Sequence, residues 1–89
     1  MNYRDITIQT RPRKRDTINL HAFRCQLITI GNTRTYLLSE TKRELERRHI
    51  FLLPGCKIID DGVAYRIFDV WYSPRPMHPF ITVYRDYAV

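Results

Sequence analysis

The sequence predicts a mainly β fold, a small antiparallel β-barrel or sandwich with one short α-helix at about residues 41–48. Apolar and polar residues alternate along six or so short runs, which is the period of a β-strand. Turn-forming residues separate these runs. Only one segment carries helix signals, so we expect the strands to form a closed or two-layered β structure around a single helix.

The length and composition indicate one folded domain over residues 1–89. Hydrophobic residues make up 44% of the chain and aromatic residues 12%, well above the content of a disordered chain. A chain of 89 residues has room for one thin core and for no second domain. Because such a core leaves little surplus over chain entropy, we expect self-association or a partner to add stability.

The N-terminal part predicts a strand, a basic loop and a long strand. Residues 3–10 alternate in the manner of a strand. Residues 11–16 contain a proline and four cations, which cannot continue a buried ladder, so they predict an exposed loop. Residues 17–30 are β-branched and aromatic, but their alternation shifts near Arg24. We interpret them as one long strand with a bulge or bend.

The helix prediction depends on its start signal. A turn at residues 31–32 returns the chain into a strand over residues 33–39. Thr41 is then followed three residues later by Glu44, the spacing of a capping box, and the next residues are strong helix formers without Gly or Pro. A helix of about two turns is marginal alone, so we expect Leu45 to hold it against the core.

The C-terminal half predicts strands separated by tight turns. The segments are strands at 49–54 and 57–59, a turn at 60–62, a strand at 63–72, a Pro-rich turn at 73–79 and a last strand from residue 80 to 87. In the strand at 63–72, Tyr65 and Ile67 share one parity, whereas Phe68, Val70 and Tyr72 share the other. Both faces of this strand are therefore apolar enough to be covered.

The basic charge is concentrated near the N-terminus. The chain has fifteen Lys and Arg residues, twelve of them Arg, against nine Asp and Glu, a formal net charge of +6. The exposed loop supplies the candidate contact residues Arg11, Arg13, Lys14 and Arg15. Guanidinium groups suit phosphates and carboxylates alike, so the loop is expected to contact nucleic acid or an acidic protein surface.

Metal-binding and nucleophilic motifs are missing from the sequence. His21, His49 and His78 are far apart and match no metal-binding spacing. Cys25 and Cys56 have apolar flanks and no CxxC spacing, so we expect buried, inert, reduced thiols.

The remaining candidate for acid–base or metal chemistry is the pair Asp60-Asp61. Because Gly62 follows and strands flank the pair, a hairpin turn is the simpler interpretation. No phosphate-binding glycine loop is present. We therefore expect no catalytic residue, no metal, no cofactor and no enzymatic activity.

The sequence carries no signal for membrane insertion or export. Its apolar runs are too short to span a bilayer, and the first ten residues lack the apolar stretch of a signal peptide. We expect a protein made in the cytoplasm with no membrane partner.

Residues 48–84, RHIFLLPGCKIIDDGVAYRIFDVWYSPRPMHPFITVY, carry a resemblance to a known family. A strand ending near a proline (50–54) precedes a Gly/Asp turn (60–62), then a strand with Tyr65, Ile67 and Val70, and then His78 leading into the last strand through Ile81 and Val83. In this order of elements the chain resembles the head-closure, or stopper, proteins of long-tailed bacteriophages, which are small β-barrel subunits of the head-to-tail connector.

The resemblance implies a structural subunit of the virion at the head–tail junction. Such a subunit assembles in the host cytoplasm with copies of itself into a ring, docks on the portal and adaptor ring, helps to retain packaged DNA and receives the tail. Packaged DNA is a further contact expected of the basic loop. A small basic nucleic-acid-binding β-barrel of the OB- or SH3-like kind stays open as the alternative.

Overall fold

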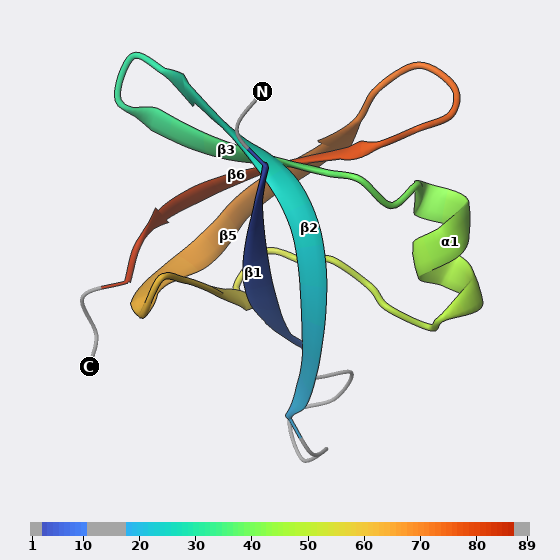
Figure 1. Cartoon of the computed structure of the whole chain (residues 1–89), viewed down its shortest axis with the longest axis horizontal. Coiled ribbons are helices and arrows are strands. Elements are labelled where there is room, and N and C mark those ends of the chain that lie inside the picture. Colours follow the sequence, from blue (N-terminus) through green and yellow to red (C-terminus); the bar gives the residue numbers. More distant parts are fainter. Residues whose placement is uncertain (1–2, 11–17, 87–89) are drawn as a thin grey trace.

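The computed structural model describes residues 3–10 and 18–86, and their strands form a closed antiparallel barrel with one short helix beside it (Figure 1). The elements are β1 Tyr3–Thr10, β2 Asn19–Ile30, β3 Thr33–Leu38, α1 Lys42–Arg47, β4 Lys57–Asp60, β5 Val63–Tyr72 and β6 Pro79–Arg85. The strand order is β1-β2-β3-β6-β5-β4, and β4 pairs with β1 to close the barrel. The predicted fold class is confirmed, and of its two expected forms the barrel is the one observed.

The long second strand joins two ladders of the barrel. Its first part pairs with β1, from Asn19 opposite Thr10 to Gln26 opposite Tyr3, and its last six residues pair with β3. Neither ladder of these described residues contains a register shift, so of the bulge or bend expected near Arg24 the bulge is absent. The strand instead curves along its length (Figure 1). A strand that bends in this way can serve both sides of a small barrel.

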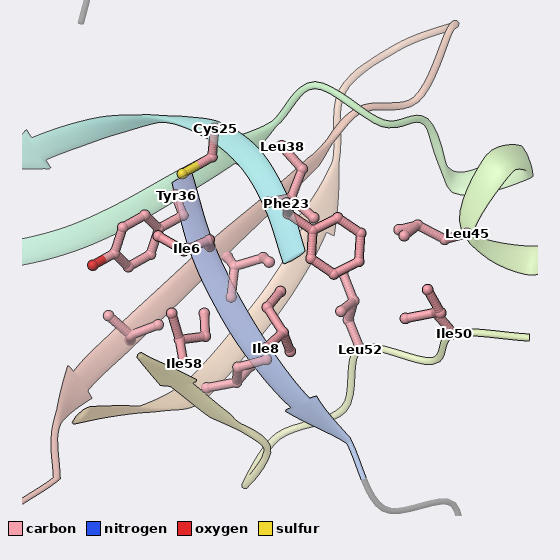
Figure 2. Packing of buried hydrophobic residues seen from close by; sticks show 13 residues of the cluster. Ile6, Ile8, Phe23, Cys25, Tyr36, Leu38, Leu45, Ile50, Leu52 and Ile58 are labelled. Atoms are coloured by element: carbon pink, nitrogen blue, oxygen red, sulfur yellow. The ribbon is translucent and has the colours of Figure 1, made fainter. Parts of the chain in front are cut away.

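The helix forms as the capping signals predict. Thr41 is the N-cap, the amide of Glu44 donates to its hydroxyl, and the Glu44 carboxylate accepts from the amide of Thr41. Leu45 is 2% exposed and packs beside Ile50, close to Phe23 of the barrel (Figure 2). The helix is therefore held by one buried leucine and its cap.

Residues 49–54 do not form the strand that their alternation predicts. Ile50 and Leu52 are buried while Phe51 and Leu53 are exposed, so the side chains alternate as in a strand, but the backbone joins no ladder. After Arg66, β5 pairs with β6 alone, but the chain reaches the other side of β5 only through the backbone bonds of Gly55 and Cys56 to Ile67, after the segment has ended. It runs instead from α1 to β4 and adds two apolar side chains to the core (Figure 2).

The turn between β4 and β5 is shorter than predicted. Asp61 and Gly62 have φ values of 52° and 77°, the left-handed pair of a two-residue hairpin turn. Asp60 lies outside this turn, because it is the last residue of β4 and pairs with Val63. Its side chain is buried, so assigning the whole of 60–62 to the turn was wrong for this residue.

A β-bulge in β5 exchanges the two faces of that strand. The register with β6 shifts between Ile67 and Asp69. Tyr65 and Ile67 before the bulge, and Val70 after it, all pack on the core, although their sequence parity differs. Phe68 lies at the bulge and is 67% exposed. The outer face of β5 is therefore apolar, as expected, and it is uncovered in the isolated chain.

The core occupies the barrel interior and continues under the helix (Figure 2). Its buried apolar residues are Ile6, Ile8, Phe23, Cys25, Tyr36, Leu38, Leu45, Ile50, Leu52, Ile58, Ile67, Ile81 and Val83. Every strand contributes to this cluster, which agrees with the thin single core that the chain length predicts.

Candidate interaction surface

The predicted contact residues of the basic loop, Arg11, Arg13, Lys14 and Arg15, lie outside the described residues. Their contact with DNA or with an acidic protein therefore stays a prediction.

The cysteines and histidines occupy separate places in the fold. Both cysteines are free: Cys25 is fully buried, whereas Cys56 is partly exposed, so the expectation of two buried thiols holds for Cys25 alone. Burial raises the pKa of the Cys25 thiol to about 12, which removes it as a nucleophile near neutral pH. His21 contacts the Thr10 hydroxyl at 3.1 Å and His78 lies 3.2 Å from the Leu38 carbonyl oxygen. Within residues 3–10 and 18–86, no three His, Cys, Asp or Glu side chains form a metal-binding group.

A buried carboxylate gathers three donors at one end of the barrel. Asp60 is 4% exposed, and its Oδ2 accepts hydrogen bonds from Arg4 at 2.6 Å, from Arg34 at 2.7 Å and from the Tyr36 hydroxyl at 2.6 Å. The Arg34 guanidinium also lies 4.6 Å from the ring centroid of Tyr65, within the range of a cation–π contact. These contacts join β1, β3, β4 and β5.

The environment of Asp60 keeps its carboxylate charged. Burial by itself would raise the pKa of Asp60, but the hydrogen bonds from Tyr36, Arg34 and Arg4 outweigh burial and hold the pKa below its usual value. A charged carboxylate whose oxygen is occupied by three donors is a poor proton acceptor. The cluster therefore stabilises the barrel and offers no acid–base chemistry.

A second buried carboxylate is paired in a similar way. Asp86 is 6% exposed, and its Oδ2 lies 3.1 Å from Nε of Arg66 and 3.7 Å from Nζ of Lys57. Both cations line a cleft of about 500 Å³ together with Cys56. Because Asp86 balances part of their charge, this cleft is a weaker anion site than its two cations alone would suggest.

An exposed aromatic surface covers the outer side of β5 and β6. We call Phe68, Trp71, Phe80 and Tyr84 the aromatic face. Trp71 and Phe80 are opposite each other in the ladder, and their rings stack with centroids 4.0 Å apart and an interplanar angle of 1°. Phe68 is 67% exposed, Trp71 48% and Tyr84 52%. The Asp69–Thr82 pair lies between the Trp71–Phe80 pair and Tyr84 in the ladder, so the aromatic residues alternate with polar ones, as on a binding surface.

A shallow apolar cleft lies between α1 and the segment that follows it. We call it the helix cleft; its volume is about 370 Å³, and its lining residues are Lys42, Leu45, Glu46, Ile50, Phe51, Leu52, Leu53 and Tyr72. Phe51 and Leu53 are more than half exposed. Nζ of Lys42 lies 5.1 Å from the ring centroid of Tyr72 and 4.0 Å from a carboxylate oxygen of Glu46. The cleft is thus apolar with a balanced pair of charges at its edge.

Comparison with models of known protein families, with curated proteins and with solved structures gave no match for this chain. The described part of the chain contains no helix with the length and apolar character needed to cross a membrane.

Sequence reasoning missed the Asp60 cluster, although a signal was present. Arg4, Arg34 and Asp60 each share the parity of buried apolar residues on their own strands, such as Ile6, Tyr36 and Ile58. Three charged residues at inward positions, two cations and one anion, indicate an internal ion-pair cluster. The assignment of Asp60 to a turn with Asp61 and Gly62 overlooked this pattern.

Proposed function

We propose that the chain is a structural subunit of the head-to-tail connector of a long-tailed bacteriophage, a head-closure protein of the stopper ring. In this role it forms a homo-oligomeric ring with copies of itself, docks on the portal and adaptor ring, helps to retain packaged DNA and receives the tail.

The observation that carries the proposal is the aromatic face. Phe68, Trp71, Phe80 and Tyr84 all lie within residues 48–84, the segment that resembles the stopper family. The exposure of Phe68, Trp71 and Tyr84 gives that segment a surface suited to protein assembly, since aromatic residues are enriched at interfaces. The closed barrel adds support, because it leaves only short unpaired strand edges and so favours binding through side-chain surfaces.

The same surface gives one reason to keep a second candidate, a small basic nucleic-acid-binding barrel. Exposed aromatic rings on the strands of a small barrel can stack on bases, and the net charge of +6 favours a polyanion. Against this candidate, Trp71 already stacks one ring face on Phe80.

The test is to mix the purified chain with connector complexes from heads that lack it and to image the mixture by negative stain. We expect an added ring below the adaptor, with the symmetry of the complex. A mixture in which connectors gain no density at a saturating concentration of the chain would reject the proposed function. Charge reversal of exposed Arg43 and Arg47 on α1 provides a variant for mapping which end of the subunit docks.

A further inference from the structure

The aromatic face and the helix cleft lie on opposite sides of the same strand. Trp71 belongs to the aromatic face, and the next residue, Tyr72, lines the helix cleft. Consecutive residues of a strand point to opposite sides, so the two surfaces face in different directions. One of them projects aromatic rings, whereas the other is hollowed.

We propose that copies of this chain bind one another head to tail, with the aromatic face of one copy seated in the helix cleft of the next. Such a contact uses two different surfaces of each copy, so it repeats and closes into a ring when the rotation per copy allows. The inference rests on the proposed function in that it names the surfaces that would build the ring.

The area of the aromatic face fits the centre of a protein interface. An aromatic side chain presents about 150–250 Å², so the exposed fractions of Phe68, Trp71 and Tyr84, 67%, 48% and 52%, leave roughly 300 Å² of apolar surface. This is a large share of the roughly 800 Å² that each partner buries in a standard interface, the remainder being polar rim. Phe51 and Leu53 at the cleft supply the matching apolar surface on the other copy.

The local charges favour a second copy as the occupant despite the net charge of +6. On the aromatic face, Asp69 is exposed and makes no ion pair with any described residue. The helix cleft presents Lys42 at its edge, 43% exposed, where its Nζ lies 5.1 Å from the Tyr72 ring centroid and 4.0 Å from a carboxylate oxygen of Glu46. An exposed carboxylate of a second copy, such as Asp69, can therefore compete with Glu46 for Lys42 when the face is seated in the cleft.

The test is sedimentation velocity over a concentration series with two variants that each disable one surface. Phe68→Glu places a charge on the aromatic face, and Phe51→Glu places one at the cleft. Both side chains are more than half exposed, so circular dichroism should show an unchanged fold. Each variant alone should weaken self-association by about 30-fold or more, the loss typical of an interface hot spot.

Mixing the two variants separates a head-to-tail contact from a symmetric one. The intact cleft of the Phe68→Glu variant can bind the intact face of the Phe51→Glu variant, so an equimolar mixture should form a 1:1 dimer and grow no further. Leu20→Glu is the matched control, because Leu20 is 64% exposed on β2 and belongs to neither surface. This variant should assemble as the wild type does. If a glutamate variant unfolds, Phe68→Ser and Phe51→Ser replace the pair.

Three results would overturn the inference: a wild-type chain that is monomeric at every concentration, a mixture that remains monomeric, or dimers that Phe68→Glu abolishes and Phe51→Glu leaves intact. The last result would indicate a symmetric dimer through the aromatic face. A failure of the proposed function would give a different result. The wild type would then assemble head to tail in sedimentation velocity but would add no ring to connector complexes.

Discussion

The hydroxyl of Tyr36 on β3 donates a 2.6 Å hydrogen bond to Oδ2 of Asp60 on β4, although these strands lie on opposite sides of the barrel. Two strands separate them in either direction around the barrel, so no main-chain ladder joins them. Arg4 and Arg34 donate to the same oxygen. The bond therefore crosses the barrel interior and links elements that the sheet hydrogen bonds leave apart.

Replacing Asp60 with Asn should destabilise the barrel by about 2 kcal/mol, because the amide leaves Arg4 and Arg34 without their buried anion. Both arginines are partly exposed, so water can solvate them, and this limits the loss of stability. For a domain of this size the melting temperature should fall by about 10 °C. Asp61→Asn is the matched control: Asp61 is exposed in the turn, and Asn tolerates its positive φ. Equal melting temperatures for the two variants would contradict the role given to Asp60.

The pH dependence of the free energy of unfolding should show the contribution of the Asp60 carboxylate. The pKa of Asp60 is lower in the folded state than in the unfolded state. Its contribution to the free energy of unfolding is therefore fully present above the pKa of an unfolded Asp, about 4. This contribution is lost as the pH falls through the lower pKa of the folded state. Thermal melts between pH 7 and pH 2 should show a shallower acid decline for Asp60→Asn than for the wild type. Parallel acid declines would mean that other carboxylates control acid unfolding.

The sequence predicts the barrel well where local signals decide the structure. The capping box of Thr41 and Glu44 fixes the helix start, and β1 and β5 begin and end as alternation predicts. The errors occur where partners distant in sequence decide. Residues 49–54 alternate like a strand but join no ladder, because the chain meets the free side of β5 only at Gly55 and Cys56. The inward position of Asp60 follows the parity of Ile58, but its partners Arg4 and Arg34 are far away in sequence.

Cys25 and Cys56 should differ in reactivity by orders of magnitude. Cys25 is fully buried with a pKa raised to about 12 by burial, whereas Cys56 is partly exposed at the edge of an open cleft. At pH 8 a thiol reagent should modify one cysteine quickly and the second only on unfolding. Peptide mapping by mass spectrometry identifies which is which, and Cys56→Ser should abolish the fast phase. Fast modification of Cys25 in the folded protein would contradict its burial.

The basic residues Arg11, Arg13, Lys14 and Arg15 separate the two candidate functions. For a stopper subunit, we expect the free chain to bind duplex DNA weakly, and reversal of these four charges to impair docking or DNA retention in assembled particles. A nucleic-acid-binding barrel would instead bind tightly, with a log–log salt slope of roughly −3 to −4 from four neutralised phosphates. Fluorescence anisotropy over a salt series measures the slope. Tight binding at physiological salt that the reversal abolishes would favour the nucleic-acid-binding barrel.

DNA retention in phage heads tests the central claim most directly. Heads assembled without this chain should release packaged DNA to added nuclease and should not accept tails. Adding the purified chain should restore both nuclease protection and tail joining, and Leu20→Glu should restore them as well as the wild type does. Heads that hold their DNA and join tails equally well with and without the chain would contradict the proposed role as a head-closure subunit.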